Sequence, residues 1–525
     1  MKVKLSSQKN IKNLADPAIT ISYGLAVLVF QCIYIIVPLR MIISNGFMTW
    51  VSPAMAVSGI ALFVISWIID PKRYLSKELV IPWLFIIVLI ASSASNYDRG
   101  LIENIKTIIW QADLMLLIFS SFIFLGKAYA EGGSSNDVTI EGTLAKDMPV
   151  DAAVPASAGT GIKAVYYAAI IVMLIWDTAV VVSLIQFFQM SDYTVIAENG
   201  WIYHQGFDGG RLFGIITTPY NASILSFYVS VASVCIAVYC RKNRKLKIFC
   251  IVSAFLAITM IVLSGTRSVM LGILFSCAVI VIVVMLKNQR ICCHIRSSFF
   301  RAVIAVIIAL IVSAGVFMLQ EGYGRALRYG TTELNSLTLS TKQSNLERTD
   351  VSGDISNNRF SIWKDYIHVF MDRPSKMLLG YSPCGYMEYI DKNYPDLYIV
   401  SYVKWKYPLM YKIRHEVYAT HNSVITVLIS TGFAGLALLI ALIVQSLKHI
   451  VGYYLRCRPG IEDYCMLAVL LTTAVALMFE SDIFYQCSAT SVVFWMVLGA
   501  VFGRGIGSRT SGAVSQTHNK DINDD

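Results

Sequence analysis

The sequence predicts an all-α polytopic membrane protein with about twelve transmembrane helices. The 525 residues are 56% hydrophobic and only 14% charged, with a mean hydropathy of +0.62, unlike a soluble globular domain. Apolar runs of about 20 residues, enough to cross roughly 30 Å of hydrocarbon, recur from end to end. Because these runs are continuous and lack the alternation of barrel strands, they are expected to be helices.

The apolar runs also give the expected order of elements. The predicted spans are 18–39, 47–69, 79–95, 107–125, 164–189, 213–239, 247–264, 268–286, 302–319, 421–446, 464–481 and 484–502. They divide the chain into N-terminal transmembrane helices (1–125), a flexible cytoplasmic linker (126–163), core transmembrane helices (164–319), a large extracytoplasmic loop with short helices (320–420), C-terminal transmembrane helices (421–502) and a cytoplasmic tail (503–525).

The distribution of basic residues predicts the orientation. With the N-terminus in the cytoplasm, the inside segments hold 25 Lys and Arg and the short outside connections hold 5. The cluster from Arg241 to Lys247 marks its turn as cytoplasmic, so both termini are expected inside and the large loop outside. The net charge of +10 is spread over such turns without a nucleic-acid motif, so no nucleic-acid partner is expected.

The cysteines predict neither a disulfide framework nor a metal site. Of eleven cysteines, only Cys384 falls clearly in the large outside loop. The sequence Cys292-Cys293-His294 lacks the spaced ligand pairs of a structural zinc site. No metal and no cofactor are therefore expected.

The large loop carries a predicted amphipathic helix and many tyrosines. Asn357-Asn358 is expected to cap a helix that stops at Pro374 and lies on the membrane surface or against the bundle. Its apolar face is predicted to hold Phe360, Trp363, Ile367 and Phe370. The tyrosines suit either an interfacial belt or the faces of sugar rings; they are Tyr381, Tyr386, Tyr389, Tyr394, Tyr398, Tyr402, Tyr407, Tyr411 and Tyr418.

Four basic residues are expected at one depth, at the outer membrane face. Arg211 precedes the sixth span, Arg267 lies in a tight turn between the seventh and eighth, Arg359 starts the loop helix and His421 starts the tenth span. An arginine near hydrocarbon costs about 2.5–3.5 kcal/mol on insertion scales, so Arg267 indicates an anionic or watery neighbour, or else snorkels to the interface. Converging guanidinium groups are well suited to bind a diphosphate.

His421 is the candidate general base. A histidine titrates near neutral pH and can accept a proton, although a single histidine before a helix is also a common interfacial or capping residue. His415 and Glu416 are candidates to orient it or to compete for its role. Asp113 and Asp177, predicted inside spans, are either functional or hydrogen-bonded within the bundle.

These pieces resemble the O-antigen ligase and O-antigen polymerase superfamily. They occur in the family's order, with its long outside loop, and cover roughly residues 200–450. The matching motifs are Arg211-Leu-Phe-Gly with Pro219-Tyr-Asn221, Ser264-Gly-Thr-Arg267-Ser, Asn358-Arg359-Phe-Ser-Ile-Trp363 with Pro374 and Leu379-Gly380-Tyr, and His421-Asn422 with Gly432-Phe-Ala-Gly435. Two positions depart from the family pattern: Ser382 replaces the second glycine after the loop proline, and Ser430 stands where an acid is common.

The resemblance implies a glycosyltransferase of surface polysaccharide assembly in the bacterial cytoplasmic membrane. Its donor would be an oligosaccharide linked to undecaprenyl diphosphate, its acceptor a glycan or lipid-linked hydroxyl at the outer face, and its chemistry inverting and metal-independent. Arg211 and Arg267 would hold the diphosphate, Arg359 would complete this site or position the sugar, and His421 would be the base. Asn422 and Trp363 would support them.

Three alternatives remain open from the sequence. A polymerase is slightly favoured over a ligase, but no residue decides between these acceptors. A multi-span transporter or flippase of a lipid-linked or polar substrate is the rival of another class, although the halves show no evident repeat and the long loop lies between spans nine and ten. A structural membrane partner without activity is the third.

Overall fold

The computed structural model describes residues 16–44, 50–132, 156–239, 243–287, 298–337, 358–417, 419–457 and 459–521. Within these ranges, eleven helical segments are long and apolar enough to cross a membrane, which confirms the predicted helical, polytopic class. The expected eleventh span, 464–481, corresponds to helix α19, Ile461–Ala476, which has 16 residues and is shorter than a full crossing requires. The membrane sidedness stays a prediction.

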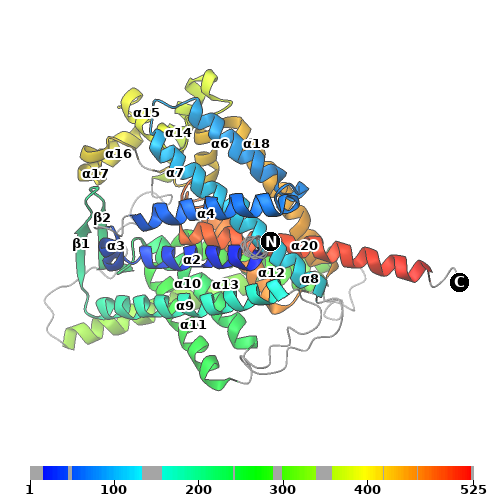
Figure 1. Cartoon of the computed structure of the whole chain (residues 1–525). Helices are drawn as coiled ribbons and strands as arrows, with labels where there is room; N and C mark the ends of the chain where they lie inside the picture. Colours follow the sequence, from blue (N-terminus) through cyan, green and yellow to red (C-terminus); the bar gives the residue numbers. More distant parts are fainter. Residues whose placement is uncertain are drawn as a thin grey trace, which may run out of the picture.

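The first half of the chain forms most of the bundle in Figure 1. Its elements are α2 (Pro17–Tyr34), α3 (Val37–Ile43), α4 (Val51–Ile69), α5 (Pro71–Tyr74), η2 (Lys77–Leu79), α6 (Val80–Ala94), α7 (Leu101–Ala112), η3 (Asp113–Ile118), α8 (Phe119–Gly132), α9 (Ala156–Phe188), β1 (Asp192–Ile196), β2 (Ile202–Asp208), β3 (Arg211–Gly214), α10 (Pro219–Tyr239), α11 (Arg244–Ser264) and α12 (Arg267–Lys287).

The second half adds the large loop and the last helices. Its elements are α13 (Ser298–Leu337), α14 (Arg359–Asp372), η6 (Pro374–Lys376), α15 (Gly385–Asn393), α16 (Tyr398–Lys406), α17 (Pro408–Arg414), α18 (Ser423–Arg456), α19 and α20 (Ala489–Asp521). In Figure 1, α14 to α17 gather at one side of the bundle, and α20 extends beyond the opposite end from α3 and β1.

Four predicted boundaries were wrong because helices continue past the apolar runs. Helix α13 continues to Leu337, into the expected loop, and α20 includes most of the expected tail. Helices α8 and α9 take up both ends of the expected linker, whose middle, 133–155, lies outside the described residues, as does Cys292-Cys293-His294. Backbone hydrogen bonding continues through polar helix formers, so a fall in hydropathy does not by itself end a helix.

The sequence did not predict a small sheet between α9 and α10. Strands β1, β2 and β3 are antiparallel in that order, with a register irregularity between Gly206 and Phe207. The sheet is fixed to the end of α2 by a bridge between Ile36 and Ile216. Strands of four to seven residues are too short to give a clear alternating pattern.

Lipid-facing surfaces and close helix contacts both agree with a membrane bundle. On α11, large apolar side chains at helical spacing are exposed: Ile248, Ile251, Val252, Phe255 and Ile258. Helix α20 approaches α8 through Gly499, Gly503 and Gly507, where an added Cβ would lie 2.1–2.8 Å from the α8 backbone. Small residues four apart let membrane helices approach closely.

A break in α18 fixes part of the large loop to the bundle. Gly432 has non-helical backbone angles inside α18 (φ 67°), and an added Cβ there would lie 2.4 Å from Leu378 O. Next to this break, Tyr381 N donates to Ile429 O and Phe433 N donates to Met377 O. The glycine of the last motif, Gly432, therefore has a structural role: only glycine lets the backbone of α18 approach the backbone at Leu378 so closely.

The large loop has its own apolar core, which changes the interpretation of its aromatic residues. Helix α14 buries Ile362, Tyr366, Val369 and Phe370, whereas Phe360 is 64% exposed. Of the predicted apolar face, Phe370 is buried and Trp363 is partly buried, whereas Phe360 and Ile367, which is 45% exposed, are not covered by protein; the buried positions are those that face α16 and α18. Three of the tyrosines are neither belt nor surface residues but part of this core: Tyr381, Tyr386 and Tyr389. Tyr418 and Asn357 lie outside the described residues.

Candidate active site

Three segments that are distant in the sequence bring Arg359, His421 and Glu480 together. Arg359 is the first residue of α14, His421 comes two residues before α18, and Glu480 lies in the connection 477–488 between α19 and α20. Arg359 Nη2 donates to Glu480 Oε1 at 2.6 Å, and His421 Nδ1 lies 3.0 Å from Glu480 Oε2. One carboxylate therefore holds a guanidinium with one oxygen and an imidazole with the other.

This triad is partly shielded but still open to water. The Arg359 and His421 side chains are each 22% exposed, and the Glu480 side chain is 15% exposed. A charge-assisted hydrogen bond is stronger in such a setting than on an open surface. The arrangement can hold an imidazole in one orientation while a substrate still reaches it.

Asn422 fixes the start of α18 and the connection that carries Glu480. Its Oδ1 accepts hydrogen bonds from the backbone N–H groups of Val424 and Ile425, which caps the helix. Its Nδ2 donates to Met478 O at 2.9 Å. The side chain next to His421 thus joins the helix to the opposite segment.

Ser423 continues this attachment, and the backbone at His421 is strained. Ser423 N donates to Leu477 O at 3.0 Å, and Ser423 Oγ donates to Glu480 O at 2.9 Å. His421 has a φ of 51°, in the left-handed region that non-glycine residues rarely adopt. Strain of this kind persists only where surrounding contacts hold it, and it is frequent at active sites.

Trp363 holds the backbone beside the histidine. It lies four residues after Arg359 on α14, and its Nε1 donates to Thr420 O at 3.0 Å. The Phe479 ring lies 6.3 Å from the Trp363 ring and 5.8 Å from the Arg359 guanidinium carbon. Asn358, the N-cap of α14, has a φ of 63° and makes no side-chain capping bond, unlike the predicted cap.

Arg211 and the Arg267 turn form a second group of basic residues. Arg211 begins β3, and its Nε donates to Ser264 O at 3.2 Å, at the end of α11. Gly265 makes the predicted tight turn (φ 59°), and the exposed Arg267 begins α12. Thr266 Oγ1 donates to Pro219 O, which attaches this turn to the start of α10.

The electrostatics of the connection 477–488 link these two groups. Burial alone would raise the pKa of Glu480, but His421, Arg359 and Arg211 outweigh burial, and the pKa is lowered. Glu480 is thus an anion at neutral pH. Burial, and then the charge of Glu480, raise the pKa of Asp482 to about 7. Two carboxyl groups two residues apart therefore differ in protonation.

The other predicted residues have different surroundings. Glu416 pairs with Arg414 at 3.6 Å, and His415 is exposed with its ring against Tyr411. The carboxylate on His421 Nδ1 is that of Glu480. Within the spans, Tyr23 donates to Asp113 and Ser253 donates to Asp177. Among the residues that the structure describes, no three His, Cys, Asp or Glu gather to hold a metal ion.

Sequence reasoning missed Glu480 and Asp482. Glu480 lies at the end of the predicted span 464–481 and Asp482 directly follows it, so counting spans places both at the same membrane face as His421. Two acids at the end of an apolar run are a signal that could have been used. The missing information was that Glu480 meets Arg359 and His421, because these contacts join segments about 60 and 120 residues apart.

Comparison with known proteins gives one family match. Residues 252–440 match the family model described as O-Antigen ligase. The matched range includes Arg267, Arg359 and His421, whereas Arg211 and Glu480 lie outside it. No curated protein gives a significant match. The family match confirms the predicted resemblance to the O-antigen ligase and polymerase superfamily, and it indicates a membrane enzyme of surface polysaccharide assembly that uses lipid-linked glycans.

Proposed function

Starting from this family match, we propose that the chain transfers a glycan from undecaprenyl diphosphate to an acceptor hydroxyl at the outer face of the cytoplasmic membrane. The preferred acceptor is the next lipid-linked repeat unit, which makes the enzyme a polymerase; a ligase is the alternative. The observation that carries the proposal is the Glu480 carboxylate between Arg359 and His421.

His421 is the general base of the proposed reaction. With Nδ1 on Glu480, the imidazole can take the acceptor's hydroxyl proton at Nε2. The hydroxyl oxygen then bonds to the anomeric carbon as the bond from that carbon to the diphosphate oxygen breaks. Glu480 stabilises the imidazolium that forms, as the carboxylate does in other base–carboxylate pairs.

The arginines have two different roles in this proposal. Arg211 and Arg267 bind the diphosphate and stabilise its charge as it leaves. Arg359 is instead a positioning residue: its hydrogen bond keeps Glu480 ionised and directed at His421. This role differs from the one predicted from the sequence, in which Arg359 completed the diphosphate site or positioned the sugar.

The direct test uses the full chain in nanodiscs with the undecaprenyl-linked repeat unit of its host. His421→Ala should lower transfer by about 100-fold or more, because general base catalysis contributes that much. His368→Ala, at an exposed histidine on α14, is the matched control and should keep normal transfer. Normal transfer by His421→Ala would refute the assignment.

Deletion in the host separates the possible acceptors. A polymerase predicts loss of long chains while single repeat units still reach the surface. A ligase predicts polymer that accumulates on undecaprenyl diphosphate and never reaches its final anchor. An unchanged glycan and lipid pool would favour the transporter, and full complementation by His421→Ala would favour a structural partner without activity.

A further inference from the structure

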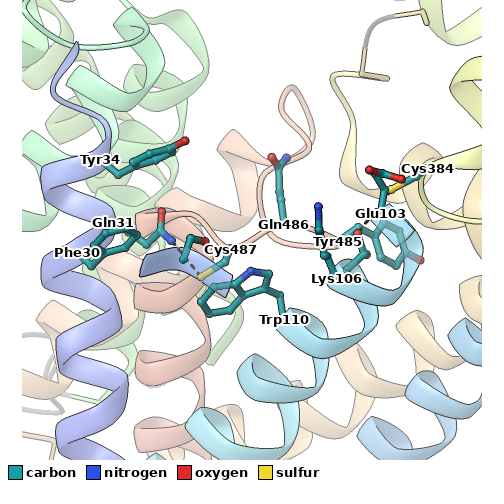
Figure 2. A pocket seen from close by; sticks show the side chains of 12 residues that line it. Phe30, Gln31, Tyr34, Glu103, Lys106, Trp110, Cys384, Tyr485, Gln486 and Cys487 are labelled. Carbon is teal, nitrogen blue, oxygen red and sulfur yellow. Dashed lines mark hydrogen bonds between the residues drawn. The ribbon is translucent and has the colours of Figure 1, made fainter. Parts of the chain in front are cut away.

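A cavity of about 340 Å³ opens beside the candidate active site. As Figure 2 shows, Gln31 and Tyr34 face it from α2, Lys106 and Trp110 face it from α7, and the connection 477–488 runs between the two helices. None of the four predicted basic site residues lines this cavity. It is therefore a separate compartment that shares one segment with the triad.

One wall of this cavity is a piece of the large loop fixed to α7. The buried Asn104 accepts a hydrogen bond from Cys384 N at 3.0 Å and donates to Ser382 Oγ at 3.1 Å. Thr107 Oγ1 lies 3.6 Å from Cys384 Sγ. These contacts hold loop and helix together without any ligand, so the wall is already formed.

The shared segment connects the cavity directly to the catalytic carboxylate. Gln486, in the cavity lining, donates from Nε2 to Ser481 O at 3.0 Å and to Asp482 Oδ1 at 3.3 Å. Ser481 is the neighbour of Glu480 in the chain. Next to Gln486, Tyr485 has a φ of 69° and is held by a hydrogen bond from its N–H to Gln111 Oε1. A strained, tightly held backbone is common where a ligand is gripped.

The lining chemistry is that of a carbohydrate site. Sugar rings have an apolar face of C–H groups and a rim of hydroxyls, so they need aromatic surfaces together with amides and charged groups. Trp110 and Tyr34 supply aromatic surface, while Gln31, Gln486 and Lys106 supply donors and acceptors. The volume is at the lower end of the range of roughly 300–1,000 Å³ seen for small-molecule sites.

We propose that this cavity binds sugar units of the glycan on which the enzyme acts. The proposal rests on the proposed transfer reaction and adds the site that recognises the sugar chain. The connection 477–488 then joins recognition to chemistry: Gln486 contacts the sugar while Glu480, six residues earlier, holds the base. The sugar units belong either to the donor or to the acceptor, and the kinetic measurement below distinguishes the two.

Binding is measured on the full chain in nanodiscs by titration calorimetry. The probe is the free oligosaccharide released by mild acid from the host's undecaprenyl-linked pool. Gln486→Ala and Lys106→Ala, made separately, should each weaken binding by about tenfold, the effect of losing one good polar contact. Both side chains are exposed, and Lys106→Ala should leave the fold intact. Because Gln486→Ala also removes the hydrogen bonds to Ser481 O and Asp482 Oδ1, its Tm is measured alongside binding. Ile102→Ala, a 65% exposed position of α7 outside the cavity lining, is the matched control and should bind normally.

Transfer kinetics supply the second readout. Each cavity variant should raise KM for one substrate and leave kcat near that of the wild type; the substrate affected identifies the source of the sugars. Unchanged binding in both variants would overturn the proposal, and so would equal binding of maltotriose, an unrelated oligosaccharide. His421→Ala should bind the probe normally. If the wild type binds the probe but performs no transfer, the transfer proposal fails and the sugar site remains.

Discussion

Two arginine–carboxylate clusters lie at opposite ends of helices α18 and α19 and differ in their surroundings. The first is the triad of Arg359, His421 and Glu480, at the start of α18 and beyond the end of α19. The second surrounds Arg504, near the end of α18 and the start of α19. Both contain a guanidinium on a carboxylate, but the Arg504 and Asp463 side chains are 9% and 2% exposed, whereas those of Arg359 and Glu480 are 22% and 15% exposed.

The Arg504 cluster is closed by its neighbours. Arg504 is 7% exposed and pairs with Asp463, which is 2% exposed, while Glu462 lies 3.8 Å away. Tyr453 donates to Asp463 at 3.0 Å. The Tyr129 ring centre lies 4.1 Å from the Arg504 guanidinium carbon. Regular helices carry all five residues, so the cluster joins α8, α18, α19 and α20.

The triad has what the Arg504 cluster lacks. It includes an imidazole, its central guanidinium and carboxylate are 22% and 15% exposed, and left-handed backbone occurs at His421 and at Asn358, next to Arg359. A closed, fully surrounded ion pair stabilises a fold, whereas a pair that is partly open and held by strained backbone can act on a substrate. The two clusters contain the same pair of residue types, so residue type alone does not distinguish an ion pair that stabilises the fold from one in an active site.

The largest expected effect comes from breaking the closed cluster. Arg504→Met leaves Asp463 and Glu462 without their cation and should lower the free energy of unfolding by about 3–5 kcal/mol. Thermal unfolding of the chain in detergent measures this loss. Lys127→Met is the control, because its pair with Glu131 is 3.8 Å long and 44% exposed, and should cost under about 1 kcal/mol. Equal losses in the two variants would contradict the assigned structural role.

The open cluster should lose activity rather than stability. Glu480→Gln keeps the shape and can still accept a bond from Arg359, but it cannot stabilise an imidazolium. We expect kcat to fall by about 100-fold with little change in Tm. Glu388→Gln, at an exposed position of α15, should be neutral in both measurements. A large fall in Tm with kcat retained would make Glu480 a structural residue like Asp463.

The sequence predicts the helical spans well because hydropathy is a local signal, and short motifs select Arg359 and His421 as candidate site residues. The turn at Gly265 and the helix stop before Pro374 follow from single residues. Arg359 and His421 were selected by their position at helix starts, and the structure places them 2.6 Å and 3.0 Å from one carboxylate.

Long-range partners explain most of what the sequence could not supply. Glu480 meets Arg359 and His421 only through the packing of α14, α18 and the connection 477–488. The buried face of α14 depends on α16 and α18, which decide that Tyr366 is covered and Ile367 is not. The sheet that carries Arg211 is held by the end of α2, far away in the chain. Tertiary contacts of this kind override local patterns.

A smaller effect is expected in the pH dependence of stability, through Asp482. Its raised pKa of about 7, caused by burial and then by Glu480, means that the folded chain keeps a proton that the unfolded chain releases near pH 4. The resulting stability is fully present at about pH 4 and is lost as pH rises through about 7. We expect Tm of the wild type to fall between about pH 4 and 7 because of this group, and Asp482→Asn to flatten this slope. Parallel curves for the two proteins would show that Asp482 does not cause it.

The smallest expected effect concerns Trp363, whose hydrogen bond to Thr420 O holds the backbone next to His421. Trp363→Phe removes the bond from Nε1 to Thr420 O and keeps an aromatic ring near Phe479. One net hydrogen bond contributes about 0.5–1.5 kcal/mol, so kcat should fall roughly 2–10-fold while Tm changes little. Trp405→Phe, at a side chain that is 78% exposed, is the control. If Trp363→Phe instead lowers Tm and leaves kcat unchanged, Trp363 serves the packing of α14, and the open cluster is held by Asn422 and Ser423 alone.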